Sequence, residues 1–368
     1  EEAVQRKRPP ADPSSKTGAA ARASGRFSGW RGVPGLLAVA LVRAAPLALM
    51  FFAVALLSLL GACAEQEPEI TLRAADDHEL SYPTSQGLVR MGELLEQWSD
   101  GRIEVRVYPQ AQLGSERETI QKTRRGLIDI NRVNINPVTT IEPSLKALAL
   151  PYIFRSTEHM HRVVDGEIGR ELLDNLEDSG LIGLGYYDSG QRSFYSSAGP
   201  IRSIEDLEGQ RIRVQKAPIM EDMVRAVGAV PVRMAFEEVY TGLQTGVIQG
   251  AENNFPSWVT KGHYEVARYY TLDAHVRAPE VILFSKKTWE KLEAEDRDLI
   301  RRAAQESVPY QRKLWEEKVQ DSIEKAREAE CEIITDIERA PFVEAMESVY
   351  EKHAGELMDY VERIRAVQ

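Results

Sequence analysis

Two short segments of the chain combine side-chain types that suit the binding of an anion. Residues 209–215 read GQRIRVQ, and residues 250–256 read GAENNFP. In the first segment Ile212 and Val214 alternate with Arg213, which predicts a strand with one apolar and one polar face. A planar guanidinium can give a carboxylate two parallel hydrogen bonds, and ligands bind at the carboxyl ends of strands in α/β units. Arg213 is therefore the first candidate for binding an acidic ligand, and a structural ion pair is the alternative.

The part of the chain before these segments predicts an α/β domain. Residues 70–75 are expected to form a strand, apolar residues recur at helical spacing over 88–98, and apolar and charged residues alternate over 103–107. A capping box at 115–118 opens a second helix, and residues 127–130 are expected to be the next strand. The order strand, helix, strand, helix, strand is typical of an α/β domain.

The later segments predict a second domain and then a long helical region. A strand is expected over 269–272, and the strand at 281–284 should return to the first domain. A region rich in Glu, Lys and Arg predicts helix from 288 to about 330, with a break or restart at Pro309. A short strand at residues 333–334 and a helix from 341 to 365 are expected to close the chain.

The composition indicates an acidic globular protein. The chain has 368 residues, 43% of them hydrophobic and 28% charged, so it can bury at least two ordinary cores. Its formal net charge is −11, which argues against a broad basic surface for nucleic acid. The histidines are scattered and no zinc-type spacing occurs, so neither a metal site nor another cofactor is expected. No catalytic residue is assigned, because the sequence carries no nucleophile elbow, Walker loop or dinucleotide fingerprint.

The N-terminal residues read as a leader followed by an export signal. Residues 1–32 are rich in Arg, Pro, Ser, Ala and Gly, and an apolar stretch over 47–60 leads to Leu60-Gly61-Ala62-Cys63. This pattern predicts a lipoprotein signal peptide whose lipid-modified first residue is Cys63, with 63–69 as a tether. A single membrane-spanning anchor is the alternative, but the apolar stretch is shorter than the roughly 20 residues that a spanning helix needs. Cys331 is expected to be a lone, at least half-buried thiol.

Several segments together resemble the substrate-binding proteins of tripartite ATP-independent periplasmic (TRAP) transporters, of the DctP type. The resemblance extends over residues 70–355. The matching segments are YPQAQLGSE at 108–116, ALPYIF at 149–154, GLGYYDSGQRSF at 183–194, GQRIRVQ at 209–215, MAFEEVYTGLQTGVIQG at 234–250 and the pair Glu252-Asn253.

The resemblance implies a two-domain α/β periplasmic solute-binding fold, with a central cleft and a long helix bracing both domains. The chain should cross between the domains within 181–195. The implied partners are a small organic or sugar acid, the membrane permease subunits of the transporter and, through the lipid on Cys63, the membrane itself. The expected divisions are 1–62 as leader and signal peptide, 63–69 as tether, 70–189 with about 274–316 as domain I, and 190–273 with about 317–368 as domain II.

The resemblance also adds residues to the site. In that family an arginine at the position of Arg213 grips a ligand carboxylate, and Arg192 in SGQRSF matches a second carboxylate-contacting arginine; an exposed hinge arginine is its alternative. The amide of Asn253 would complete the clamp, with Asn254 beside it. Polar groups suited to hydroxyls are expected from His78, Asn134, Asn136 and Gln215, and aromatic cover for a sugar face from Phe194 or Trp258. Asparagines before a proline are more often turn formers, and a lone histidine is more often structural.

Further matches are similar to the branch of the family that binds hexuronic acids. They are ADDH at 75–78 with YPT at 82–84, ENNFPS at 252–257 and GHYEVARYY at 262–270. The expected function is a periplasmic receptor for a hexuronate such as D-glucuronate or D-galacturonate. Two alternatives stay open: the same receptor role for a C4-dicarboxylate or another organic acid, and a lyase or isomerase that acts on an acid sugar with His78 as its base.

Overall fold

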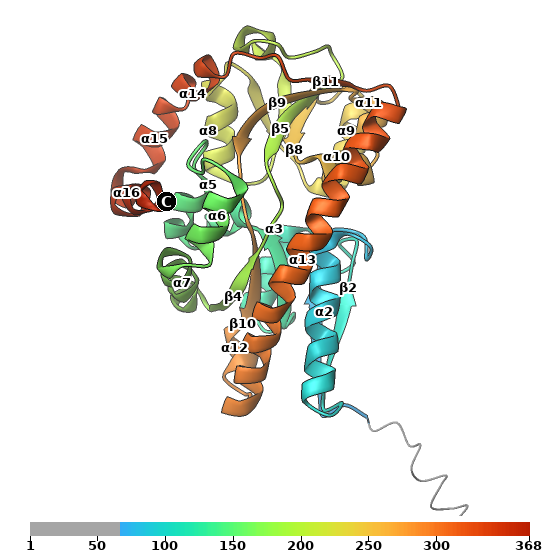
Figure 1. The fold of residues 1–368 in the computed structure, drawn as a ribbon, viewed down its shortest axis with the longest axis vertical. Helices are drawn as coiled ribbons and strands as arrows, with labels where there is room; N and C mark the ends of the chain where they lie inside the picture. Colours follow the sequence, from blue (N-terminus) through green and yellow to red (C-terminus); the bar gives the residue numbers. More distant parts are fainter. Residues whose placement is uncertain (1–66) are drawn as a thin grey trace, which may run out of the picture. The chain divides into compact units, whose positions relative to one another are not determined.

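The computed structural model describes residues 67–368, which fold around two β-sheets (Figure 1). The five-stranded sheet has the order β2-β1-β3-β10-β4, and the six-stranded sheet has the order β11-β9-β5-β8-β6-β7. We call the part built on the first sheet lobe I and the part built on the second sheet lobe II. The two sheets, each with helices packed on it, confirm the predicted α/β fold.

Lobe I is a mixed sheet. Strands β1, β2 and β3 are parallel, and β10 runs antiparallel between β3 and β4. Its strands are β1 Ile70–Ala75, β2 Ile103–Tyr108, β3 Ile130–Asn134, β4 Leu181–Tyr187 and β10 Glu280–Ser285. The helical elements between these strands, with the one that follows β10, are α2 Pro83–Trp98, α3 Glu116–Arg124, α4 Ile135–Val138, η1 Pro143–Leu145, α5 Lys146–Ala149, α6 Thr157–Val164, α7 Glu167–Asp174, η2 Asn175–Ser179 and α12 Lys286–Trp289.

Lobe II is also mixed, with β6 parallel to β7 and β8, and β5 antiparallel to β8 and β9. Its strands are β5 Arg192–Ser196, β6 Arg211–Val214, β7 Val230–Arg233, β8 Gly250–Asn253, β9 Tyr269–Val276 and β11 Glu332–Ile334. Its helical elements are η3 Ile204–Leu207, α8 Pro218–Ala226, η4 Phe236–Glu238, α9 Val239–Gln244, α10 Phe255–Thr260 and α11 His263–Val266. Gly250 allows close strand pairing, because a Cβ there would lie 2.6 Å from the Tyr195 carbonyl oxygen.

The chain passes between the lobes at residues 188–191 and 277–279. The first crossing joins β4 to β5, within the predicted span of 181–195, and the second joins β9 to β10. The strand at β10 returns to lobe I as the sequence predicted.

A single long helix connects the two lobes. Helix α13 spans Ala294–Glu328 and packs against α2 and β4 in lobe I and against α10 in lobe II (Figure 1). This arrangement confirms the predicted bracing helix. The predicted break at Pro309 is wrong: the helix runs through the proline, since packing of Ala303, Ala304 and Trp315 on either side outweighs the lost backbone hydrogen bond.

Three other boundaries differ from the sequence prediction. The third strand is Ile130–Asn134 and not 127–130, because all five of its residues are buried and pair with β10 or β1. Strand β9 continues to Val276, four residues beyond the predicted end. The expected C-terminal helix is divided, as α14 Ala340–Ala345, α15 Glu347–His353, η5 Gly355–Leu357 and α16 Met358–Ala366.

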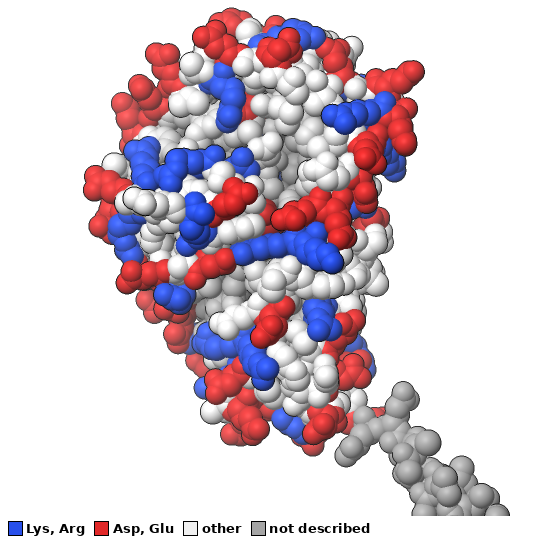
Figure 2. Space-filling view, in the orientation of Figure 1, with Lys and Arg blue, Asp and Glu red and all other residues white. Residues whose placement is uncertain are grey.

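The C-terminal helices contact both lobes, since α15 packs on α8 and α16 on α7. The residue boundaries proposed for the two domains therefore stay a prediction. Among residues 67–368 no helix is both long enough and apolar enough to cross a membrane. On the face drawn in Figure 2, acidic and basic side chains are interspersed.

Candidate functional site

Carboxyl ends of strands from both sheets meet at one small cavity. Strands β1 and β3 of lobe I end at Ala75 and Asn134, and β6 and β8 of lobe II end at Val214 and Asn253. Residues near these ends line the cavity together with the first residues of β5, β10, α3 and η4. The lining consists of Asp77, His78, Glu116, Arg132, Asn134, Arg192, Arg213, Gln215, Phe236, Asn253, Asn254, Ser257 and Glu280. Ligands bind at the carboxyl ends of strands in α/β folds. Each lobe therefore contributes one of the two walls of a candidate site.

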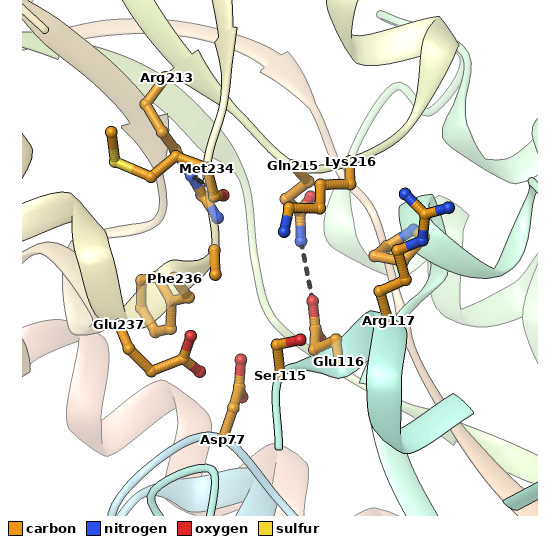
Figure 3. Close-up of a pocket in the computed structure, with 12 residues that line it drawn as sticks. Asp77, Ser115, Glu116, Arg117, Arg213, Gln215, Lys216, Met234, Phe236 and Glu237 are labelled. Atoms are coloured by element: carbon orange, nitrogen blue, oxygen red, sulfur yellow. Dashed lines mark hydrogen bonds between the residues drawn. The ribbon is translucent and has the colours of Figure 1, made fainter. Parts of the chain in front are cut away.

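Arg213 is buried in this cavity, and no described residue pairs a carboxylate with it. Its side chain is directed from β6 into the space opposite Asp77 and Glu116 (Figure 3). In residues 67–368 its one side-chain hydrogen bond is from Nε to the Met234 carbonyl oxygen, at 3.0 Å, and no carboxylate lies within 4.0 Å of its nitrogens. Burial lowers the pKa of the guanidinium. The two terminal nitrogens therefore remain available for an anion. Arg213 forms no ion pair within the described residues, in contrast to the structural alternative.

Arg192 is equally buried but is already paired. Its Nε and Nη2 contact the two carboxylate oxygens of Glu252 at 2.5 and 2.9 Å, and Nη1 donates to Asn253 Oδ1 at 2.8 Å. Although burial opposes it, Arg192 lowers the pKa of Glu252 to about 2, so the pair is ionised. The alternative of an exposed hinge arginine is wrong, because Arg192 is only 2% exposed. Its contact with a ligand stays a prediction.

The two asparagines after β8 have different surroundings. Asn253 accepts hydrogen bonds from Arg192 and from the backbone of Asn254 through Oδ1, while its Nδ2 has no hydrogen-bond partner within the described residues. Asn254 caps helix α10 by accepting from Ser257 N at 2.8 Å, and its Nδ2 donates to Ser189 O at 2.9 Å. Asn253 thus keeps a donor for a ligand, and Asn254 lines the cavity with its polar atoms already bonded.

Lobe I supplies an arginine and a group of carboxylates that the sequence prediction missed. The Arg132 side chain is completely buried; Nε donates to Asp76 at 3.0 Å, Nη1 to Glu280 at 2.7 Å, and Nη2 contacts both Asp76 and Asp77. Burial opposes ionisation of Asp77, but Arg132 and His78 hold the pKa of its carboxyl below the usual range. The only sequence signal was the acidic pair after the first strand.

The cluster of Asp76, Asp77 and His78 has the composition of a metal site. One ligand atom from each lies within 4.8 Å of the others. However, the Nη2 atom of Arg132 contacts all three residues, including His78 Nδ1 at 2.8 Å. The guanidinium thus stands where a cation would bind, so the geometry supports an ion-pair network.

His78 and its neighbours also connect the lobes. Its ring stacks on Tyr82 with centroids 3.8 Å apart, and its Nε2 lies 3.4 Å from the Ser257 hydroxyl of lobe II. The Tyr82 hydroxyl is 2.9 Å from the same hydroxyl, and Lys261 donates to the Asp77 carbonyl at 3.1 Å. Burial alone would lower the pKa of His78, yet the neighbouring carboxylate of Asp77 raises it.

The predicted polar residues of the first lobe lie together at a second contact between the lobes. Asn134 donates to Glu280 at 3.0 Å and caps α4, so its role as a turn former is also present. Asn136 donates to Gln215 at 2.8 Å, and Gln215 donates across the cleft to Glu116 at 3.5 Å (Figure 3). Asn136 does not line the cavity itself; it holds Gln215, which does.

Two predicted aromatic residues are not brought to the cavity. Phe194 is 1% exposed and packs 4.5 Å from the ring of His275, and Trp258 is fully buried with Nε1 donating to the Ala267 carbonyl. Neither lines the cavity, because both side chains are packed within hydrophobic clusters. Phe236 instead lines the cavity, and its ring lies 5.8 Å from the Arg213 guanidinium carbon.

The cavity is small when the lobes are in contact. Two adjoining spaces share Asp77, Glu116, Arg213, Gln215 and Phe236, and each has a volume of about 20 Å³. A space of that size holds about one water molecule. Any organic ligand must therefore enter and leave through separation of the two walls.

The family of the chain can now be stated. Residues 75–356 match the family described as bacterial extracellular solute-binding protein, family 7. The chain belongs to this family. A solute-binding protein of Chromohalobacter salexigens is 39% identical over 279 residues, which cover 76% of this chain and 83% of that protein. Membership confirms the resemblance noted in the sequence and sets aside the enzyme alternative.

Solved structures of TRAP periplasmic solute-binding proteins share the fold of this family 7 protein. One from Xanthobacter autotrophicus Py2, with bound β-D-galacturonate, is 41% identical with a TM-score of 0.79. The match covers 81% of this chain and 100% of the Xanthobacter chain. One from Pseudomonas putida F1, with bound D-glucuronate, is 39% identical with a TM-score of 0.79, covering 81% and 97% of the two chains. The two-domain receptor fold is thereby confirmed.

Glu116 provides a test of the charge distribution in this site. Burial and the charges of Asp77 and Glu280 raise its pKa from 4.5 to about 8. The folded protein therefore holds a proton there that the unfolded chain has released, so this group lowers stability as pH rises from about 4.5 to 8. Glu116→Gln, which resembles the protonated form, should raise the melting temperature relative to wild type more at about pH 9 than at about pH 5.

Glu118→Gln on the same helix is the matched control. The backbone hydrogen bond from Ser115 lowers the pKa of Glu118, so this variant should show no stabilisation at high pH. An equal effect of Glu116→Gln at both pH values would show that Glu116 is not held protonated by its neighbours.

Proposed function

We propose that this protein is the periplasmic receptor of a TRAP transporter that binds a hexuronate, such as D-glucuronate or D-galacturonate, and delivers it to the membrane permease. The observation that carries the proposal is the buried Arg213, whose terminal nitrogens face the cavity with no carboxylate partner among residues 67–368. A desolvated guanidinium binds a carboxylate strongly and with defined geometry. The two solved relatives described above, each with a bound hexuronate, support the same ligand class.

The remainder of the cavity supports a sugar rather than a simple acid. In the lining, lobe I offers the carboxylates of Asp77 and Glu280, and lobe II offers the amides of Asn253 and Gln215 besides Arg213. Carboxylates accept hydrogen bonds and amides both donate and accept, which suits ligand hydroxyl groups. We assign the apolar contact to Phe236, in place of the Phe194 or Trp258 expected from the sequence.

Transport by this receptor would depend on relative movement of the lobes. Contacts between side chains of the two lobes, such as Gln215 with Glu116 and Ser257 with Tyr82, are hydrogen bonds that can break and form again. Closure around a ligand bound by both walls is a common form of domain motion. The alternative of a C4-dicarboxylate ligand uses the same fold and the same Arg213, so direct binding measurements must separate the two.

The central test is the affinity of Arg213 variants for D-galacturonate, measured by calorimetry. Arg213→Lys keeps the charge but loses the fork, and Arg213→Gln loses both; a partner left buried and unpaired costs about 2 to 5 kcal/mol of binding. Arg211→Lys is the control on the same strand, because Arg211 is exposed and bonds backbone carbonyls away from the cavity. Wild-type affinity in Arg213→Lys would contradict the proposed clamp. Tighter binding of succinate than of either uronate would favour the dicarboxylate alternative.

We also propose that the mature protein is attached to the membrane through lipid on Cys63. The supporting observation is the sequence Leu60-Gly61-Ala62-Cys63 after an apolar stretch, which lies outside the described residues. Expressed with its leader in a Gram-negative host, the wild-type protein should incorporate labelled palmitate, and Cys63→Ser should not. Equal labelling of the two proteins would rule out Cys63 as the anchor.

A further inference from the structure

The two walls of the cavity differ in their ionisable side chains. Lobe I contributes the carboxylates of Asp77 and Glu280 and the protonated carboxyl of Glu116, together with His78 and Arg132. The lining from lobe II contains Arg192, which is paired with Glu252, and Arg213, which is not paired with a carboxylate of the described residues. Among the described residues, Glu237 is the one lobe II carboxylate that lines the adjoining space, and none lines the space between Arg213, Asp77 and Glu280. A ligand with a single carboxylate therefore has one favourable orientation, with the acid group toward lobe II.

The arginine of lobe I is not free to bind a second ligand carboxylate, because its donors are already used and the three carboxylates around it outnumber its one positive charge. Arg132 bonds Asp76 through Nε and Nη2, Asp77 through Nη2, and Glu280 through Nη1. Its side chain and that of Asp76 are fully inaccessible, and those of Asp77 and Glu280 are each 5% exposed. Three carboxylates thus surround one guanidinium, and no donor of Arg132 points to the cavity without a partner.

The behaviour of Glu116 supports a negative potential at this wall. Its side chain is 13% exposed and lies 3.6 Å from Arg132, yet burial, with a further contribution from the charges of Asp77 and Glu280, raises its pKa to about 8. The field of the neighbouring carboxylates thus outweighs the nearby guanidinium. A ligand carboxylate brought to the same place would meet the same repulsion.

We infer that Asp77 and Glu280 are specificity-determining residues that exclude ligands with a second carboxylate at the end opposite the first. The receptor then accepts monocarboxylate sugar acids and rejects the corresponding dicarboxylate sugar acids. This inference rests on the proposed function, in which Arg213 holds the first carboxylate. The exclusion acts through repulsion and through the occupied donors of Arg132, since a like charge opposed at close range costs binding without any change of pocket shape.

Calorimetry with a matched set of ligands tests the inference. D-Galacturonate carries one carboxylate; galactarate carries one at each end of the same carbon chain; and D-galactonate, open-chain with one carboxylate, reports the effect of opening the ring. The wild-type protein should bind galactarate more weakly than D-galactonate. Glu280→Gln removes one charge and leaves Arg132 Nη1 less tightly held, so the ratio of galactarate to D-galacturonate affinity should rise at least about tenfold.

Asp77→Asn is the second variant and should shift the ratio in the same direction, so the test does not depend on the folding of one mutant. Glu171→Gln is the control, because Glu171 pairs with Arg363 away from the cavity. A gain of binding for galactarate cannot arise from damage to the fold. The ratio of D-galactonate to D-galacturonate affinity should be the same in the variants as in the wild-type protein.

Two results would overturn the inference while leaving the proposed function intact. One is wild-type protein that binds D-galacturonate and galactarate equally well. The other is a pair of folded variants, Glu280→Gln and Asp77→Asn, whose affinity ratios match wild type. Failure of any uronate to bind, with galactarate bound by wild type, would contradict the proposed function and the inference together.

Discussion

The cleft depends on a buried guanidinium, that of Arg213, which has no carboxylate partner in the described part of the chain. Arg213 is 3% exposed, and its one described side-chain hydrogen bond is to the Met234 carbonyl. Removing a charge from water without a partner costs several kcal/mol, and an arginine remains protonated in proteins. An anion that binds in the cavity therefore stabilises the folded protein, so ligand binding should raise the free energy of unfolding.

The neighbouring charges are arranged so that none of them satisfies Arg213. Behind the cavity, Arg192 pairs with Glu252, and His275 lies 3.5 Å from Glu252 and 2.6 Å from Asp273. Burial would lower the pKa of His275, yet Asp273 and Glu252 raise it to about 9. Four charges thus alternate in sign and balance one another, which fixes Asn253 at the cavity and leaves Arg213 for the ligand.

The elements that position the site were predictable where local pattern decides structure. Helix α2, the capping box of α3 and the strands β1, β6 and β10 follow from periodicity and capping residues within a few positions. The predicted helix break at Pro309 was wrong because the hydrogen bond lost at a proline is a local effect that the sequence shows. The packing that keeps α13 continuous involves α2 and α10, which are distant in sequence.

The composition of the site was less predictable for the same reason. Arg132 is 56 positions from Asp76 and 148 from Glu280, so no spacing in the sequence reveals that they meet. Phe194 does not line the cavity, because all residues of β5 are buried and alternation then does not distinguish the core from the cavity. Arg213 was a candidate from its place between Ile212 and Val214 near a strand end, but this pattern left a structural ion pair equally open, and the family resemblance was what favoured a ligand contact.

The most direct measurement is a crystal structure of the complex with D-galacturonate. The ligand carboxylate is expected to bond the terminal nitrogens of Arg213, with the other end of the sugar toward Asp77 and Glu280 and the bonds of Arg132 unchanged. A carboxylate bound instead by Arg132, with Asp77 displaced, would contradict the assignment of Arg213 as the anion-binding residue.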